Sequence, residues 1–308
     1  MSDYPNKYIL VVYYSQSGQL KTISDNFMLP FRESGCEIEM VEIKPKKAYT
    51  FPWTGKSFFD VMPESVLCIK GQLEEPDFKR NKYDLVVFAY QPWFLSPSIP
   101  ASTLLQNEKF QAIIQNTPVV TLIGARNMWI SAQEKIKKLL ATAKANLVGN
   151  IVLTDKNPNL ISAITIQYWM FTGKKEKLFG IFPKPGVSEK DINLAHVFGS
   201  QVLKCLNQNN LSQLQNELID KKALSVNHIL MFVESRAIKI FHIWAGTIIH
   251  KKNRSAWLLL FKYYLIIALF LLSPLVISIY LLLIYPLNSA SIKNRLKYYQ
   301  SVTYLPQR

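Results

Sequence analysis

Small polar residues and a glycine follow directly on the first apolar segment of the chain, and together they form a candidate anion site. Residues 8–14 are apolar or aromatic and rich in Val, Ile and Tyr, which is typical of a buried strand. From Leu20 onward, apolar residues recur every three or four positions, which predicts a helix. Free N–H groups and the positive end of the dipole at the start of such a helix point into the turn before it. We therefore expect a bound phosphate to be contacted by Ser15, Gln16, Ser17, Gly18, Gln19 and Leu20. The alternative is an ordinary connection between a strand and a helix.

Two later loops carry residue types that suit a flat or an anionic ligand. Residues 83–89 predict a buried strand, and the loop after it consists of Tyr90, Gln91, Pro92, Trp93, Phe94 and Leu95. Residues 118–123 predict another strand, which is followed by Gly124, Arg126 and Asn127. Aromatic rings offer flat apolar faces, glycine permits close approach, and an arginine side chain suits a carboxylate. The alternatives are simple aromatic packing in the first of these loops and a surface ion pair for Arg126.

Strands and helices alternate along the first part of the chain. Strands are predicted at residues 8–14, 37–43, 83–89, 118–123 and 146–154, and helices at residues 20–32, 101–115, 132–145 and 187–206. This alternation predicts an α/β fold with a parallel sheet covered on both faces. For five strands the order 2-1-3-4-5 is the flavodoxin-like, doubly wound arrangement, in which ligands bind outside the carboxyl ends of the strands. The three loops described above all lie at such ends.

The first 210 residues resemble a known superfamily. The run Tyr14-Ser15-Gln16-Ser17-Gly18 is similar to the phosphate loop of flavodoxin-like proteins, which bind FMN, although that family usually has Thr where this chain has Leu20. The run Val11 to Leu20, with Arg126-Asn127-Met128-Trp129, resembles the branch known as dialkylresorcinol condensing or aromatising enzymes. The resemblance implies bound FMN, oxidative aromatisation of a cyclic substrate that carries alkyl chains, and a ketosynthase partner.

Catalysis under this interpretation needs a cation that holds an anionic group and a general base. Arg126, or Lys174 and its neighbours, would hold an enolate or carboxylate. Tyr90 or Tyr168 would act as general base at a lowered pKa. The alternatives are a membrane-bound NAD(P)H-dependent quinone or FMN reductase and a flavodoxin-type electron carrier docked to a membrane. The three cysteines and four histidines show no metal-ligand spacing, so no metal site is expected.

Two segments interrupt or extend this α/β pattern. Residues 45–63 are an aromatic-rich loop or helical excursion, and residues 156–186 are an insertion positioned to cover the site. A polar run, Asn207 to Asn210, marks the predicted boundary between a cofactor-binding domain (1–210) and a membrane-association region (211–308).

The last 88 residues differ in chemistry from the rest. They hold twelve Lys or Arg and one acid, so +11 of the net charge of +15 lies there. Residues 229–249 predict an amphipathic surface helix, and residues 256–287 contain one charge, Lys262. Basic residues flank this apolar block, which favours membrane lipids over nucleic acid as the partner. We expect a hairpin or re-entrant loop turning near Ser273-Pro274, with the enzyme on the cytoplasmic face of the cell membrane.

Overall fold

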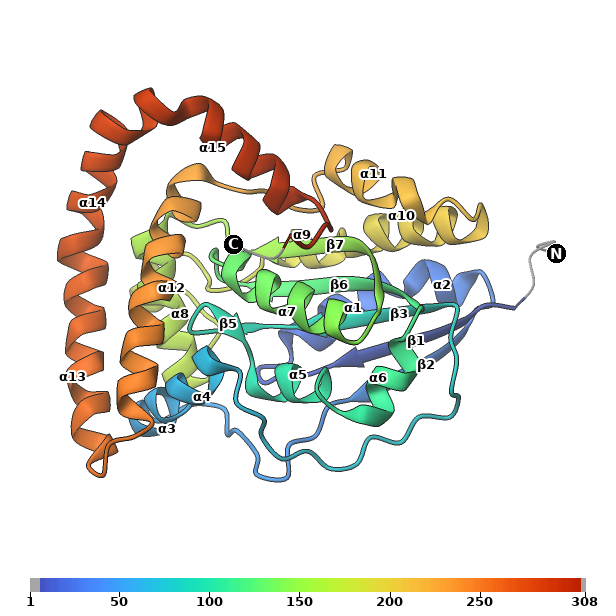
Figure 1. Cartoon of the computed structure of the whole chain (residues 1–308), viewed down its shortest axis with the longest axis horizontal. Coiled ribbons are helices and arrows are strands. Elements are labelled where there is room, and N and C mark those ends of the chain that lie inside the picture. Colours follow the sequence, from blue (N-terminus) through green and yellow to red (C-terminus); the bar gives the residue numbers. More distant parts are fainter. Residues whose placement is uncertain (1–5, 306–308) are drawn as a thin grey trace.

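The computed structural model describes residues 6–305 and shows an α/β part flanked by long C-terminal helices (Figure 1). Five parallel strands form one sheet in the order β2-β1-β3-β6-β7. They are β1 (Tyr8–Tyr13), β2 (Glu37–Glu42), β3 (Leu85–Tyr90), β6 (Pro118–Ala125) and β7 (Asn146–Thr154). Numbered along the chain this order is 2-1-3-4-5, so the predicted flavodoxin-like fold class is confirmed.

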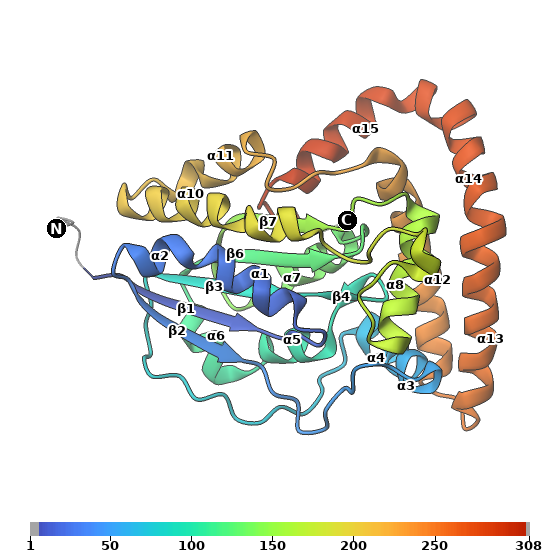
Figure 2. The ribbon, with the colours of Figure 1, turned by 180° about the vertical axis from the view of Figure 1, so that it is seen from behind.

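Both faces of the sheet are covered by helices, which explains the uninterrupted apolar strands. Ile9 and Val11 lie in one buried cluster and Leu10 and Val12 in the other, as the two-residue period of a strand requires. One face carries α1 (Gln19–Phe27), α2 (Leu29–Glu33), α9 (Glu189–Asn193), α10 (Ala195–Asn207) and α11 (Leu214–Asp220), as Figure 2 shows. The other carries α5 (Ile99–Leu104), α6 (Glu108–Ile114) and α7 (Ile130–Thr142).

Some predicted helices are divided in the structure. Residues 20–32 form α1 and α2, which meet at Met28, and residues 101–115 fall within α5 and α6. The second break is stabilised by Asn107, whose side chain accepts the Phe110 N–H at 3.0 Å and so caps α6. The excursion at residues 45–63 leads into two short helices, α3 (Gly55–Asp60) and α4 (Met62–Leu67).

The segment predicted as an insertion folds as a helix beside the carboxyl ends of the strands. It contains α8 (Asn159–Thr172) and a single 3-10 turn, η1 (Leu178–Gly180). The chain then enters α9 with Ser188 as N-cap, and the Ser188 hydroxyl accepts the Asp191 N–H at 3.1 Å.

The C-terminal part begins after α11, whose packing on β7 extends the cover of the sheet beyond residue 210. α12 (His228–Ile248) crosses the carboxyl side of the sheet, and a second helical segment extends from Arg254 to Gln300. Its first part lies alongside α12, and after a kink at Asn288 its last part turns back toward the α/β part (Figure 1). Its segments are α13 (Arg254–Ile267), η3 (Ala268–Leu272), α14 (Ser273–Ile279), η4 (Tyr280–Ile284) and α15 (Tyr285–Gln300). Within residues 6–305 this is the helix whose length and composition would allow it to cross a membrane.

The predicted turn near Ser273-Pro274 is wrong, because the helix continues through both residues. Proline lacks the N–H that an α-helix interior requires, and its ring clashes with the preceding turn. Here the preceding turn is the π-helical segment η3, whose wider hydrogen-bonding pattern accommodates the ring. The apolar block is thus a single rod rather than two short limbs.

Candidate functional site

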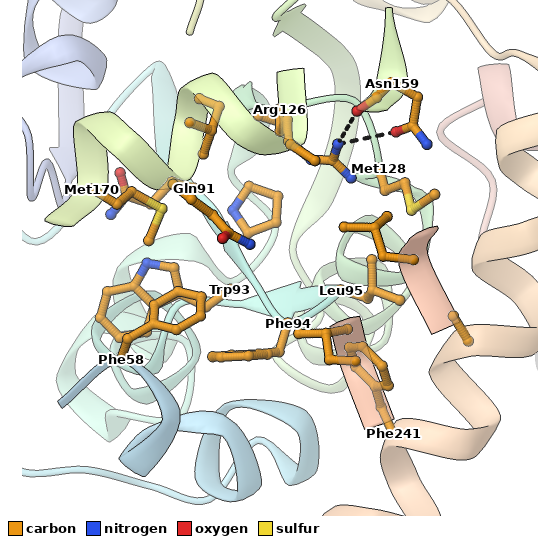
Figure 3. Close-up of a pocket in the computed structure, with 18 of the residues that line it drawn as sticks. Phe58, Gln91, Trp93, Phe94, Leu95, Arg126, Met128, Asn159, Met170 and Phe241 are labelled. Carbon is orange, nitrogen blue, oxygen red and sulfur yellow. Dashed lines mark hydrogen bonds between the residues drawn. The ribbon is translucent and has the colours of Figure 1, made fainter. Parts of the chain in front are cut away.

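A cavity of about 460 Å³ lies at the carboxyl ends of the strands, where the structure brings the three predicted loops together (Figure 3). Small-molecule sites commonly have volumes of about 300 to 1,000 Å³. From the three loops the cavity is lined by Gln16, Ser17, Gln19, Leu20, Gln91, Pro92, Trp93, Phe94, Leu95, Gly124 and Arg126. The arrangement follows from the parallel sheet, in which these ends share one edge.

The loop before α1 offers backbone donors to this cavity. The Lys21 N–H donates to Ser15 Oγ at 3.1 Å, whereas the N–H groups of Gln19 and Leu20 have no partner among the described residues. Gly18 has φ of +82°, a conformation that glycine adopts without steric cost. A Cβ at Gly18 would meet nothing within 4 Å, so the glycine is needed for its backbone angle rather than for close approach. Two free N–H groups at the positive end of a nine-residue helix suit a phosphate.

The second loop is a strained hairpin. β4 (Pro92–Trp93) pairs with β5 (Ser96–Pro97), and the two residues between them, Phe94 and Leu95, have φ of +46° and +59°. Such turns usually carry Asn-Gly, and other residues in this conformation cost about 1–3 kcal/mol each. Packing holds the turn, since the Phe94 ring lies 4.8 Å from that of Phe58. The turn held in this way places two large apolar side chains, Phe94 and Leu95, against the cavity.

Trp93 is held by a cage of other aromatic rings. It packs edge-to-face against Tyr14, Tyr49 and Trp53, with ring centroids 5.8, 5.0 and 5.4 Å away. The cavity wall also includes Phe51, Trp53 and Phe58 of the aromatic excursion and Trp169 of α8. These rings offer flat apolar faces to a planar ligand and leave few polar atoms to hold water.

Arg126 supplies a largely buried positive charge. Its Nη1 donates to the backbone oxygen and to Oδ1 of Asn159, at 2.9 and 3.0 Å, as Figure 3 shows. Its other nitrogens have no partner among the described residues, and the side chain lines the cavity. Burial lowers the pKa of Arg126 to about 10, partly offset by Asp155, so the group remains charged near neutral pH. Asn127 Oδ1, beside it in the chain, is also buried without a partner among residues 6–305.

The lowered pKa values predicted for Tyr90 and Tyr168 are wrong. Tyr90 is fully buried, donates its hydroxyl hydrogen to Gln133 Oε1 at 2.9 Å, and does not line the cavity; burial raises its pKa well above 10. Tyr168 points away from the cavity to Glu176, and this hydrogen bond raises its pKa. Neither phenol is placed or charged as a general base must be.

Other predicted contacts also lie outside the cavity. Ser15 Oγ is engaged as a helix cap, and neither Ser15 nor Gly18 lines the cavity itself. Asn127 donates to Asn159 Oδ1 at 2.7 Å, and Arg126 donates to the same oxygen. Asn127 therefore contributes to the site by positioning Asn159 rather than by contacting the ligand. Lys174 is exposed and is absent from the lining.

A large part of the wall comes from elements that the sequence did not assign to the site. α12 contributes Val233, Arg236, Ala237, Ile240 and Phe241, and the long helix contributes Tyr264, Leu265, Ala268, Leu269, Leu272, Ser273 and Val276. Gly186, at the end of the insertion, also lines the cavity. The amphipathic pattern of residues 229–249 was the available signal, but it does not show which element the apolar face covers.

Among residues 6–305 no group of three or more His, Cys, Asp or Glu side chains is placed to hold a metal ion. The site therefore consists of backbone donors at one end, aromatic walls, a buried arginine and an extended apolar region.

The fold and the position of this site define a flavodoxin-like α/β protein with a cavity at the carboxyl edge of its sheet. No protein-family model and no curated protein matches the chain. Among solved structures it is similar to a flavoprotein from Lactobacillus acidophilus in complex with FMN, with 18% identity, a TM-score of 0.38, and coverage of 47% of this chain and 93% of that one. It is also similar to a putative flavoprotein from Bacteroides eggerthii (18% identity, TM-score 0.39, 48% and 89% covered) and to a flavone reductase (10%, 0.35, 67% and 65%).

Proposed function

We propose that the protein is an FMN-dependent oxidoreductase that acts on a lipophilic cyclic substrate. The observation that carries this proposal is the convergence on one cavity of free N–H donors at the start of α1, a cage of aromatic rings and a buried arginine. The residues present fit the cofactor: the first loop suits its phosphate, and Trp93 and Phe94 give its ring apolar neighbours. When bound, FMN would supply a two-electron acceptor or donor to the site.

The apolar half of the cavity supports the proposed substrate class. Leu265, Leu269 and Leu272 line it, together with α12, so an alkyl chain gains burial there. Arg126 lines the cavity together with the aromatic loops and would hold an anionic oxygen of the reacting ring. A cyclic 1,3-diketone is acidic enough to ionise in water, so it would enter as the enolate without a protein base. Loss of a hydride followed by tautomerisation then converts this enolate into a resorcinol, which balances the reaction as removal of one hydride and one proton.

More specifically, we propose that the reaction is oxidative aromatisation, with or without ring condensation, in the biosynthesis of a dialkylresorcinol. It is supported by the motifs that resemble that branch of the superfamily and by the alkyl-sized apolar region. A ketosynthase would supply the chain-bearing precursor, and the enzyme would work on the cytoplasmic face of the cell membrane.

Cofactor binding is tested by titrating stripped protein with FMN and, in parallel, with riboflavin. We expect one FMN per chain and at least roughly tenfold weaker riboflavin binding, because riboflavin leaves the α1 donors without an anion. Tyr168→Phe is the matched control and should bind FMN unchanged, since Tyr168 does not line the cavity. Absence of FMN uptake by well-folded protein would overturn the proposal.

The reaction is tested with two substrate sets under the same conditions. One contains an alkylated cyclohexanedione with release of a resorcinol measured; the other contains NAD(P)H and a quinone. Resorcinol formation supports aromatisation. Rapid NAD(P)H oxidation without resorcinol assigns the protein to the reductases, and a stable one-electron reduced cofactor with neither activity assigns it to the electron carriers.

A further inference from the structure

The long C-terminal helix has one face that the rest of the protein leaves uncovered. Leu271, Leu282 and Leu287 are 68%, 75% and 85% exposed, and other apolar side chains of the same rod are also exposed. They include Leu259, Leu260, Tyr263, Ile266, Ile267, Phe270, Leu275, Ile279 and Leu283. An apolar surface of this extent on one helix indicates a partner that removes it from water.

Both ends of this helix are tied to the same α/β part. At its start, Arg254 forms a bidentate ion pair with Glu64 of α4, with both N–O distances 2.5 Å. At its end, the Tyr298 hydroxyl donates to Glu134 of α7 at 2.6 Å. Gln215 of α11 donates to the backbone oxygen of Gln300 at 2.6 Å. The backbone leaves the helical conformation at Asn288, so the contacts of Tyr298 and Gln300 belong to a segment that turns back (Figure 1). A helix that spans a bilayer leads the chain to the opposite side, whereas here the chain returns to the same α/β part from which the helix starts.

The middle of the rod is also packed on the protein, along α12. Phe261 is fully buried against Phe241, with ring centroids 5.3 Å apart. About five turns further along the rod, Tyr280 stacks on Phe232 at 4.0 Å and its hydroxyl lies 3.0 Å from His228 Nδ1. From residue 254 to 284 the rod is roughly 45 Å long, against about 30 Å of hydrocarbon in a bilayer. Its inner face therefore packs on α12 at both ends of this stretch and lines the cavity between them.

The charged side chains of the rod and of its flanking segments all have one sign. The chain contains no Asp or Glu after Glu234. Lys251 and Lys252 are exposed before the rod, and Lys293 and Lys297 are exposed in its last segment. Anionic lipid headgroups attract such residues, each contributing about 1 kcal/mol near a membrane surface.

We propose that the outer face of residues 254–287 lies in one leaflet of an anionic bilayer, parallel to the membrane plane, without crossing it. The rod then acts as a monotopic anchor, and its inner face, which lines the cavity, stays with the protein. This inference rests on the membrane association proposed above but not on the flavin chemistry.

Membrane binding is tested by flotation of the full chain with vesicles of phosphatidylglycerol and phosphatidylethanolamine. Leu271→Glu/Leu282→Glu should weaken partitioning at least roughly tenfold, because both charges would enter the acyl region. Leu29→Glu is the control; Leu29 is 39% exposed and lies on α2, at the far end of the α/β part (Figure 1). Circular dichroism melts show whether each variant is folded.

Topology is tested on the cell membrane with epitope tags before Met1 and after Arg308. Protease applied to inverted vesicles should remove both tags, and protease applied to intact spheroplasts should remove neither. Vesicle binding with the C-terminal tag cleaved only from outside the cell would overturn the in-plane position while leaving membrane association in place. If the protein binds no vesicles and forms a dimer that Leu271→Glu/Leu282→Glu dissociates, a second copy of the chain covers the exposed face. That result would overturn both the in-plane position and the membrane association.

Discussion

Replacing Arg126 by Met should make the ligand-free protein more stable while weakening its hold on an anionic ligand. Lowering the pKa of this largely buried arginine from its ordinary value to about 10 corresponds to a charge-burial cost of about 3 kcal/mol in the folded state. Against this, the variant loses two hydrogen bonds to Asn159, together worth about 1 to 2 kcal/mol. Asn159 Oδ1 keeps the Asn127 donor at 2.7 Å, so it is not left unsatisfied. The free energy of unfolding should therefore rise by about 1 kcal/mol.

The two effects are measured separately. Urea unfolding in detergent, followed by tryptophan fluorescence, gives the stability of ligand-free protein. Titration of FMN-loaded protein with an alkylated cyclohexanedione should show affinity lowered by roughly 30-fold or more, because a desolvated charge pair is worth at least about 2 kcal/mol. Lys174→Met removes an exposed cation and should change neither quantity beyond about 0.5 kcal/mol. Destabilisation of Arg126→Met by more than 1 kcal/mol would show that the arginine is a structural support, and the reasoning would fail.

Three further substitutions test the surroundings of the site. Gly186→Ala should lower the free energy of unfolding by about 2 to 4 kcal/mol and weaken FMN uptake, because φ is +82° and a Cβ would lie 2.8 Å from Trp169. Urea unfolding and FMN titration measure the two effects. Burial raises the pKa of Glu234 to about 7, so the folded state binds one more proton than the unfolded state between pH 4.5 and 7. The free energy of unfolding should therefore fall as pH rises through that range. Glu234→Gln should remove this pH dependence in thermal melts recorded at several pH values. Burial lowers the pKa of Lys135 to about 8, so stability should rise between pH 8 and 10.5, and an equal slope in Lys135→Met would contradict this assignment.

The sheet and the position of the site were accessible from sequence because they follow from local patterns. The strand predicted at residues 146–154 coincides with β7, since a run of apolar residues buried on both faces is unambiguous when helical patterns flank it. The three loops were found because parallel topology alone assigns them to one edge. Both results rest on the regular alternation of strands and helices.

The remaining features depend on contacts between residues far apart in the chain. The reversed backbone of Phe94 and Leu95 has no glycine to signal it and is held by Phe58 from a distant segment. The environment of Tyr90 is set by Gln133, more than forty positions away, so its raised pKa could not be predicted from its place after a strand. At Pro274 the expected break is prevented by a π turn that only the structure reveals.

The two sides of the long helix face different surroundings, the cavity on one side and the exterior on the other, and this constrains the length of the helix. Leu265 and Leu272 must face the cavity while Leu271 and Leu282 must face outward. Each residue added to or removed from an α-helix rotates everything beyond it by about 100°. A single deletion near Leu260 would therefore turn outward leucines toward the cavity and carry the Tyr298 contact away from Glu134. A change of about seven residues, close to two full turns, would restore the angular register but would still move the last segment by about 10 Å along the axis. Length variation in this segment should therefore be rare, and it should occur in steps of about seven residues.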